Sequence, residues 1–383
     1  MKRFTVLDSF RGICALCVVL HHFNITGSIT EWPLFRNATY MVEFFFVLSG
    51  FVLTHAYSKT EFHFSNLRAF AINRTFRIFP LHLMMLLVFI ILECAKYVAQ
   101  SNGIAFNKPA FSGVNAPDQI IPNLFLLQAW LPSKEILSFN YPSWSISVEY
   151  YLYAVFAVVL FLLYKRKNVL TSAFFAISFF AFYGLALPVF PSIKSEALYG
   201  IACFFGGSVT YFIYEVYKPK ECNKLLFTLM EVATLLLCYY SVTQQYGYKS
   251  IITSFSFFLT IYVFSFEMGW GSFILRKSIF EYLGKISFSV YMTHAAVIFI
   301  SISLAMACEK IFGLRFTYSV FTKSESTLRY MDFGSWFYNN FIVMIIIAIV
   351  ITVSHFTYKI IEVKSISAGK RIMKKEEVIN NKI

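Results

Sequence analysis

Residues Leu7 to Phe23 read LDSFRGICALCVVLHHF, an apolar stretch with polar groups at both ends. Asp8 and Arg11 lie near its beginning, and His21 and His22 lie at its end. Eleven residues of α-helix turn through about three full circles, so Arg11 and His22 share one face about 16 Å apart, with Asp8 a turn from Arg11. Charges at membrane depth need a partner or a water-filled cavity. The stretch therefore predicts a helix whose stripe of Asp8, Arg11 and His22 is the wall of an internal site.

The composition around this stretch is that of a membrane protein. The chain has 383 residues, of which 58% are hydrophobic and 14% charged, and its mean hydropathy is +0.64. Soluble domains are about 25% charged. Several apolar runs reach the 18 or so residues that cross a bilayer. We therefore expect an all-α integral membrane protein. In such a protein the positions of the basic residues indicate topology, so the net charge of +13 does not predict a nucleic-acid-binding surface.

The apolar runs predict a bundle of about ten transmembrane helices. Their expected ranges are 7–25, 40–57, 80–99, 144–164, 169–187, 197–215, 225–241, 249–267, 286–307 and 336–360. If both termini are cytoplasmic, most of the 33 basic residues lie in segments on the cytoplasmic side of the membrane. This is the pattern of the positive-inside rule. The prediction is an N-in, C-in membrane domain over 1–362, followed by a basic cytoplasmic tail over 363–383 that faces anionic lipid.

Two segments outside the membrane are long, 100–143 and 308–335. The first contains an apolar piece, Ile120 to Leu131, which is too short to span and is expected to be re-entrant or interfacial. No segment is left for a soluble catalytic domain, so any chemistry is expected in or at the helix bundle. Seven scattered cysteines have no metal-ligand spacing, and we predict no metal site; they are Cys14, Cys17, Cys94, Cys203, Cys222, Cys238 and Cys308.

Polar groups interrupt other predicted helices as well. The second helix reads MVEFFFVLSGFVLTHAY and carries Glu43. The cytoplasmic loop after it ends in RTFRIFP, in which Arg74 and Arg77 lie three residues apart and Pro80 is expected in the first turn of the third helix. A pair of arginines at the cytoplasmic face suits the binding of phosphate groups.

Two later helices open with similar polar clusters. The fourth begins YPSWSISVEYYLY, which places Ser147 close to the membrane-embedded Glu149. The ninth begins LGKISFSVYMTH, in which Tyr291 and His294 are three residues apart and share a helix face. These residues complete the set of candidate site residues.

The five stretches LDSFRGICALCVVLHH, FFFVLSGFVL, RTFRIFP, SWSISVEYYLY and LGKISFSVYMTH resemble, in this order, the signatures of the membrane-bound acyltransferase-3 family. The resemblance covers about residues 5 to 362. It implies a ten-helix domain that takes an acyl group from cytoplasmic acyl-coenzyme A and delivers it to a hydroxyl, often on a glycan at the outer side. The family's last signature usually reads like E-x-P, whereas Val363 and Lys364 follow Glu362 here.

The resemblance also implies roles for individual residues. Arg11 and His22 match the family's essential Arg and His, and Glu149 matches the Glu of its fourth-helix signature. The chemistry is consistent, because acyl transfer from a thioester needs a base such as His for the hydroxyl proton. On this hypothesis His22 is the base, oriented by Glu149 or Glu43. Catalytic roles are expected for His22, Arg11, Glu149 and Asp8, and substrate-binding roles for Arg74, Arg77, Glu43, Ser147, His294 and Tyr291.

Each of these residues also has a structural interpretation. His22 and His294 could be interfacial, Arg74 and Arg77 could be positive-inside anchors, and Glu149 could pair with an Arg between helices.

The expected activity is O-acyl transfer, most simply O-acetyl transfer, in a bacterial inner membrane. The expected partners are acetyl-CoA or another acyl-CoA, a surface polysaccharide or its lipid-linked precursor, and membrane lipid. The alternatives are a transporter or flippase for glycan or acyl units and a structural subunit of an envelope complex. The sequence shows no repeated pair of broken helices of the kind found in transporters, which argues against the transporter alternative.

Overall fold

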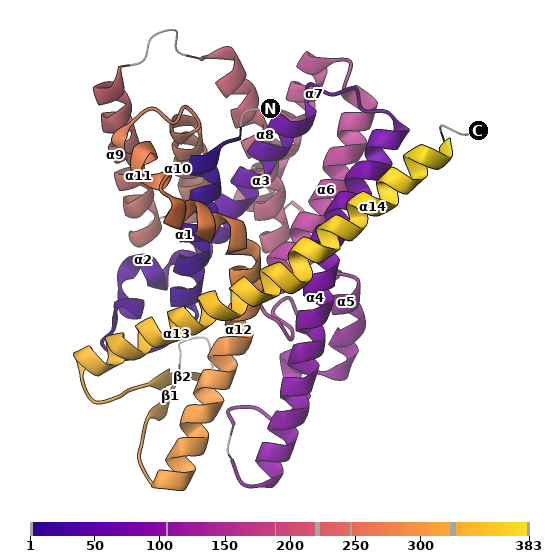
Figure 1. Ribbon diagram of the computed structural model, residues 1–383. Coiled ribbons are helices and arrows are strands. Elements are labelled where there is room, and N and C mark those ends of the chain that lie inside the picture. The colour runs from indigo at the N-terminus through magenta and orange to yellow at the C-terminus, as the bar shows by residue number, and fades with distance from the viewer. Residues whose placement is uncertain are drawn as a thin grey trace.

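The computed structural model describes residues 3–104, 106–187, 189–218, 223–245, 247–321 and 327–380, so Cys222 and the last three residues of the tail lie outside the described part. The described chain is a bundle of helices with one small β-hairpin (Figure 1). The long helices are α1 (Thr5–His21), α3 (Met41–Tyr57), α4 (Phe64–Ser101), α6 (Ser143–Leu163), α7 (Lys167–Ala186), α8 (Ser195–Val216), α9 (Lys224–Thr243), α10 (Lys249–Phe264), α12 (Ser278–Phe312), α13 (Trp336–Thr357) and α14 (Val363–Asn380).

The shorter elements connect these helices. They are α2 (Pro33–Arg36), α5 (Ile120–Leu124), α11 (Trp270–Leu275), a π-helical turn over Tyr358–Glu362, and short 3-10 turns over Ile29–Glu31, Ala38–Tyr40, Gly113–Asn115 and Pro117–Gln119. Strands β1 (Thr317–Phe321) and β2 (Thr327–Met331) pair antiparallel, with Ser319 opposite Arg329.

In the described residues, eight helical segments are long and apolar enough to cross a membrane. They are Ala38–Tyr57, Phe64–Ser101, Ser143–Leu163, Lys167–Ala186, Ser195–Val216, Lys224–Thr243, Ser278–Phe312 and Trp336–Lys374. Helices α1 and α10, with 17 and 16 residues, occupy the two other positions where the sequence predicts a span. The all-α membrane architecture is confirmed, and the number of ten crossings with both ends inside stays a prediction.

The third predicted helix is wrong at its beginning. Helix α4 begins at Phe64 and runs for 38 residues, so Arg74 and Arg77 lie on a helix and not in a loop, and Pro80 lies inside that helix. Residues 64–79 contain no Gly or Pro that would stop a helix. A helix of this length extends over about 57 Å, well beyond a hydrocarbon core of about 30 Å. Its first turns therefore carry the arginine pair beyond the apolar part of the helix.

Helix α1 packs along α12, and glycines bring the two backbones close together. A Cβ added to Gly12 would fall 2.6 Å from the backbone carbon of Leu283, and one added to Gly284 would fall 2.3 Å from the carbonyl oxygen of Asp8. Small residues allow such close contact between membrane helices. The contact fixes the polar face of α1 relative to the signature residues of α12.

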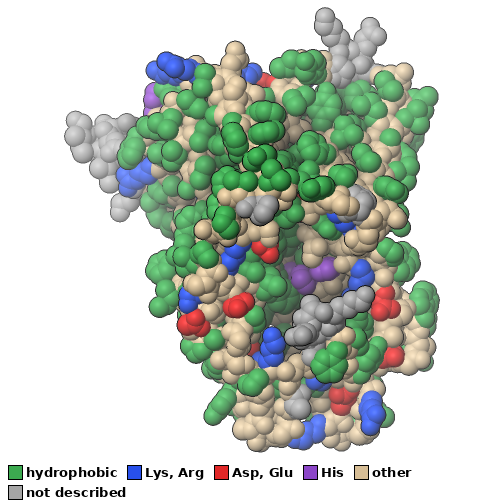
Figure 2. All heavy atoms as spheres, turned by 180° about the vertical axis from the view of Figure 1, so that it is seen from behind, with side chains coloured by type: hydrophobic (Ala, Val, Ile, Leu, Met, Phe, Trp, Pro, Cys, Tyr) green, Lys and Arg blue, Asp and Glu red, His purple; other side chains and the backbone are tan. Residues whose placement is uncertain are grey.

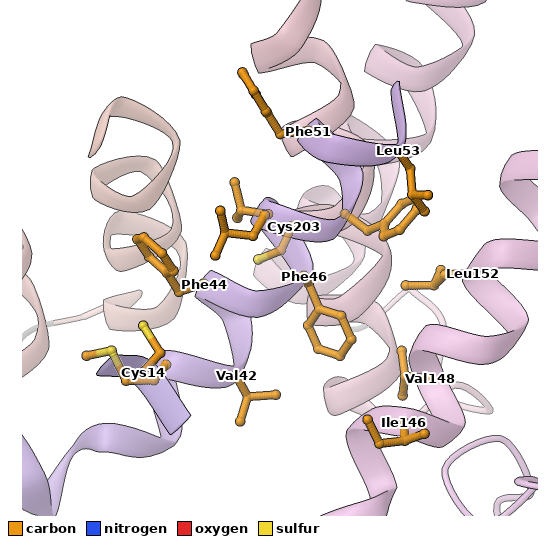
Figure 3. Packing of buried hydrophobic residues seen from close by; sticks show 14 of the residues in the cluster. Cys14, Val42, Phe44, Phe46, Phe51, Leu53, Ile146, Val148, Leu152 and Cys203 are labelled. Carbon is orange, nitrogen blue, oxygen red and sulfur yellow. The ribbon is translucent and has the colours of Figure 1, made fainter. Parts of the chain in front are cut away.

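Helix α3 fills the centre of the apolar core, between α8 and α6. Figure 3 shows Phe46 of α3 lying next to Val148 of α6, with Phe44 on another side of the same helix. Both phenylalanines are buried. Aromatic side chains supply much of this core, as in the pair of Phe51 and Tyr211, whose ring centroids are 5.5 Å apart.

The C-terminal helix does not stop at position 360, where the sequence predicts its end. It passes from α13 through the π-helical turn Tyr358–Glu362 directly into α14. Helix α14 lies along α4, and Figure 1 shows it as the long yellow helix that crosses the bundle diagonally. The basic tail is thus helical up to Asn380.

Candidate functional site

Five helices, α1, α3, α4, α6 and α12, enclose an inner cavity of about 70 Å³. A water molecule needs about 10–15 Å³ measured in this way, so the cavity holds a small group only. The residues that line it are Arg11, Val42, Phe45, Phe46, Ser49, Arg77, Ile78, Ser145, Ile146, Glu149, Tyr153, Ser287, Phe288 and Tyr291. Four predicted site residues, Arg11, Arg77, Glu149 and Tyr291, are therefore brought together from four different helices.

The charges in this cavity are balanced around Glu149. Its Oε1 accepts hydrogen bonds from the Ser49 hydroxyl and the Tyr153 hydroxyl, both at 2.5 Å. The carboxylate also interacts electrostatically with the guanidinium groups of Arg11 and Arg77. Removing one charge from such a set leaves the others uncompensated in a poorly hydrated space. Arg11 also interacts with Asp8, and Arg77 also interacts with Glu362 and Asp8, so Glu149 is one of several acidic groups that offset these two cations.

Helix α6 supplies a stripe of polar groups that sequence reasoning recognised only in part. Ser145, Glu149 and Tyr153 recur at intervals of four residues, which places them on one face of α6. Ser145 Oγ lies 2.8 Å from the Tyr291 hydroxyl of α12. The four-residue spacing was the signal that could have identified Ser145 and Tyr153, whereas the sequence analysis selected Ser147.

A buried carboxylate on the π-helical turn acts on one cation of the inner cavity, although it does not line that cavity. Glu362 is buried on the π-helical turn, accepts a hydrogen bond of 3.0 Å from Ser289 Oγ, and interacts electrostatically with Arg77. Single π-turns occur frequently at functional sites. The sequence departs from the family pattern after Glu362. The Glu362 carboxylate nevertheless acts electrostatically on Arg77, the second arginine of the pair.

Arg74 is placed differently from Arg77. Its guanidinium carbon lies 5.4 Å from the ring centre of Phe70 and 5.3 Å from that of Tyr153, so this cation contacts two aromatic rings that are nearly perpendicular to each other. Its buried Nε has no hydrogen-bond partner in the described chain. A buried donor without a partner is costly, and a bound anionic or carbonyl group would satisfy it.

A second, wider hollow of about 530 Å³ lies at the other end of α1. It is lined by His21, His22, Asn24, Arg36, Tyr141, Ala295, Ile298, Phe299, Ile302, Leu328, Arg329 and Tyr330. Figure 2 shows histidine side chains inside a hollow of this face, with basic side chains beside it. We call it the outer hollow, because the predicted topology puts it outside.

Aromatic rings surround His22 in the outer hollow. The ring centroid of His22 lies 4.6 Å from that of Tyr141, 4.8 Å from that of His21, and 5.5 Å from that of His294, on which it stacks. Among the described residues, no side chain makes a hydrogen bond to the His22 ring. The prediction that Glu149 or Glu43 orients His22 is therefore wrong: Glu149 is engaged in the inner cavity, and Glu43 points to another helix.

A layer of rings separates the inner cavity from the outer hollow. Tyr291 lines the inner cavity, Tyr141 lines the outer hollow, and His294 contacts both, with centroids 5.9 and 6.2 Å away. His294 is fully buried, and its Nε2 has no partner within the described part of the chain. Burial raises the pKa of the Tyr141 hydroxyl above its usual value, so this phenol stays protonated and can donate.

Three predicted residues lie away from both hollows. Asp8 forms an ion pair of 2.8 Å with Arg3. Glu43 is buried between α3 and α10 and accepts a hydrogen bond of 2.9 Å from Ser254. Ser147 donates to the carbonyl oxygen of Leu126 at 2.5 Å.

These contacts give Asp8, Glu43 and Ser147 structural roles. The Leu126 contact ties the apolar piece Ile120–Leu131 to α6, and Trp130 Nε1 donates to the carbonyl oxygen of Ser147 at 3.1 Å. Within the described residues, no group of three or more His, Cys, Asp or Glu side chains is arranged to hold a metal ion.

Comparison with known proteins places the chain in a family. A family model described as an acyltransferase domain matches residues 4–355. The chain is 34% identical over 140 residues to acyltransferase MdmB of Streptomyces mycarofaciens, covering 36% of this chain and 29% of that protein. It is 22% identical over 336 residues to SACOL0978 of Staphylococcus aureus (strain COL), named a candidate O-acetyltransferase, covering 78% of this chain and 51% of that protein.

The chain thus spans about half the length, or less, of these curated relatives. No solved structure matches it. The family model covers nearly the whole chain, and its match includes the inner cavity residues on α1, α3, α4, α6 and α12. The chain therefore belongs to the membrane-bound acyltransferase-3 family.

Proposed function

We propose that this protein moves an acyl group, most simply acetyl, from acyl-coenzyme A at its cytoplasmic side to a hydroxyl of a saccharide at its outer side. The observation that carries the proposal is the pair of hollows on one helix. Arg11 of α1 lines the inner cavity, His22 of α1 lines the outer hollow, and the rings of Tyr141, Tyr291 and His294 connect the two linings.

The inner cavity suits the reactive end of the donor. A thioester carbonyl develops negative charge as it is attacked, and donors fixed beforehand stabilise that charge. Arg11 and the Tyr291 hydroxyl both face the cavity. Arg74 and Arg77 lie nearer the start of α4, where the anionic part of coenzyme A would enter. A volume of about 70 Å³ fits acetyl and excludes a long acyl chain.

The chemistry follows from this placement. On this proposal the thioester and the acceptor hydroxyl meet at the ring layer, where the acceptor oxygen attacks the thioester carbon and His22 takes the hydroxyl proton as general base. The new C–O ester bond forms, the C–S bond breaks, and the leaving thiolate of coenzyme A recovers a proton. His294, stacked on His22 and next to Tyr291, lies where that proton has to cross from the outer hollow to the thiolate.

The acceptor is proposed to be a surface polysaccharide or its lipid-linked precursor, and the location a bacterial inner membrane. The outer hollow is several times larger than the inner cavity, as a sugar needs. The similarity to SACOL0978 of Staphylococcus aureus supports O-acetyl transfer.

The experiment expresses the intact chain and its His22→Ala variant in a host that lacks this protein. The two are compared at matched levels of expression in the membrane. NMR of purified envelope polysaccharide would detect ester-linked acyl groups, and calorimetry would measure coenzyme A binding to the purified proteins. We expect an ester with the intact chain, none with His22→Ala, and equal coenzyme A binding by both. Equal esterification by His22→Ala would remove the role assigned to His22, and failure of the intact protein to bind coenzyme A would refute the donor.

The size of the inner cavity gives a second readout. With purified protein, acetyl-CoA is expected to be a better donor than octanoyl-CoA by about tenfold in kcat/KM, because overfilling a packed cavity costs about 1–3 kcal/mol and about 1.4 kcal/mol corresponds to tenfold. Equal use of both donors would contradict the assignment of the inner cavity to the acyl group.

A further inference from the structure

A second hollow of about 630 Å³ shares Arg329 of β2 with the outer hollow. The second hollow is lined by Gly103, Ile104, Met306, Glu309, Lys310, Gly313, Leu314, Arg315, Thr317, Tyr318 and Arg329. We call the two hollows together the outer groove.

The charges that line the outer groove are mostly positive. Among the described residues, the cations are Arg36, Arg329, Lys310 and Arg315, and the carboxylate is Glu309. Glu309 is already used within the fold, since it accepts hydrogen bonds from the backbone N–H groups of Phe316 and Thr317. Membrane proteins place fewer cations on the outer side than on the inner side. Arg329 also donates to Asn107 Oδ1 at 2.9 Å and to Thr317 Oγ1 at 3.3 Å, which holds its guanidinium in place. Four cations along the outer groove favour an anionic occupant.

Arg36 is held beside the histidines by contacts that fix its guanidinium. It donates to Asn24 Oδ1 at 2.6 Å and to the Tyr330 hydroxyl at 3.1 Å, and lies over the Tyr330 ring at 5.4 Å. Glu31 lies 3.6 Å away and also accepts the Gly27 N–H. A pre-positioned guanidinium loses little entropy on binding a carboxylate or phosphate.

The hairpin that carries Arg329 and Tyr330 is fastened to the chain that follows His22. The Met331 N–H donates to the carbonyl oxygen of Asn24 at 2.9 Å, and the Thr26 N–H donates to the carbonyl oxygen of Met331 at 3.0 Å. Tyr318 stacks on Tyr330 at 5.7 Å. The cations are therefore fixed in position relative to His22, as specific recognition requires.

We propose that the acceptor is an anionic saccharide, whose carboxylate or phosphate is bound by Arg36 and Arg329 while the hydroxyl to be acylated lies at His22. This inference rests on the proposed function and narrows its acceptor to one chemical class. A charge-assisted hydrogen bond contributes about 1.5–3 kcal/mol, which corresponds to about tenfold or more in affinity. A neutral saccharide would gain none of this at the two arginines.

The test measures binding of four probes to the purified full chain. Oligogalacturonate is compared with the same oligomer after reduction of its carboxyl groups, and phosphomannan is compared with mannan. We expect at least one anionic probe to bind about tenfold or more tightly than its neutral counterpart, with a preference that weakens as salt is added. The pair that shows the preference identifies carboxylate or phosphate.

Variants distinguish anion binding in the outer groove from a general effect of the protein's positive charge. Arg36→Gln and Arg329→Gln are each expected to remove most of the preference and to leave binding of the neutral probes unchanged. The matched control is Lys108→Gln, an exposed cation outside both hollows, which should keep the preference. If neither anionic probe exceeds its neutral counterpart, or if Lys108→Gln reduces the preference as much as Arg36→Gln, the inference is overturned.

Acetyl-CoA binding to the same samples distinguishes this failure from failure of the proposed function. A protein that binds acetyl-CoA but shows no anionic preference refutes the acceptor class alone. A protein that shows the preference but does not bind acetyl-CoA refutes the acyl-CoA donor and leaves the outer groove as a saccharide site.

Discussion

At the residue scale, the site depends on a few polar contacts between helices. The hydroxyl of Tyr291 meets Ser145 at 2.8 Å and faces the inner cavity. Glu149 receives hydrogen bonds from Ser49 of α3 and from Tyr153 of its own helix, and it acts electrostatically on two arginines. The contacts of Tyr291 with Ser145 and of Ser49 with Glu149 join helices that are far apart in the sequence, so single substitutions should have separable effects.

Tyr291→Phe tests whether the phenol acts on the reacting carbonyl. Loss of an oxyanion donor lowers kcat by roughly 100- to 1,000-fold, and we expect a loss of this order with acetyl-CoA binding unchanged. Ser145→Ala removes the same hydrogen bond but keeps the phenol, so it should retain most activity. Steady-state kinetics of both variants would decide, and an equal loss in Ser145→Ala would show that only the packing of Tyr291 matters.

Glu149→Gln tests the charge balance of the inner cavity. The amide oxygen still accepts from Ser49 and Tyr153, but Arg11 and Arg77 lose one of the carboxylates that act on them. Breaking a buried charge pair costs about 3–5 kcal/mol, and the remaining carboxylates should keep the loss below that value, so the melting temperature in detergent should fall. The double variant Glu149→Gln with Arg11→Met should recover part of the loss, because it removes one uncompensated cation. A double variant less stable than Glu149→Gln would contradict this account.

At the scale of elements, close helix contacts set the geometry of the site. Helix α3 contributes Val42, Phe45, Phe46 and Ser49 to the inner cavity, and its other side packs against α8. A Cβ added to Gly50 would fall 1.8 Å from the carbonyl oxygen of Phe204. The position of Ser49 next to Glu149 therefore depends on the α3–α8 contact.

Gly50→Ala is expected to separate α3 from α8 and to destabilise the protein. Overfilling a packed contact costs about 1–3 kcal/mol, and contact with rigid backbone should give a value at the upper end. The melting temperature and the activity should both fall. Gly247→Ala is the control, because nothing lies within 4 Å of its added Cβ; a similar fall in both variants would argue for a general effect of the substitution.

The π-helical turn at Tyr358–Glu362 shows how one irregular element can complete a site. Without it, α13 and α14 would be a single regular helix, and the buried Glu362 would not be presented in the same way to Ser289 and Arg77. A short change in helical pitch of this kind leaves no periodic signature in sequence.

At the scale of the whole molecule, the proposed function requires that the two hollows open to opposite sides of a membrane. The positive-inside bias predicts that Lys108 lies outside and Lys167 inside. Cysteine introduced at position 108 should react with a membrane-impermeant maleimide in intact cells, and cysteine at position 167 only after lysis. The comparison uses a cysteine-free background, and labelling of both in intact cells would contradict the N-in, C-in topology.

The sequence alone determined the class of the protein and most of its helices. Long apolar runs fix all-α membrane architecture, since a backbone in lipid must satisfy its own hydrogen bonds. It also identified Arg11, Arg77, Glu149, Tyr291, His22 and His294 as candidate site residues, because polar groups in such runs are costly and stand out. The first signature placed Arg11 and His22 on one helix, and the structure shows each lining its own hollow.

Only the tertiary structure decided which polar residues meet. Glu43, Ser147 and Asp8 look like site residues in sequence, yet their hydrogen bonds and ion pair are with Ser254, Leu126 and Arg3, and Asp8 acts on Arg11 and Arg77 only electrostatically. Packing between distant helices makes Ser49 and Tyr153 line the inner cavity and Tyr141 line the outer hollow. The π-helical turn brings Glu362 near enough to act on Arg77. Helical periodicity specifies the face on which a side chain lies, but the neighbour of that face depends on helix packing, which contacts distant in sequence determine.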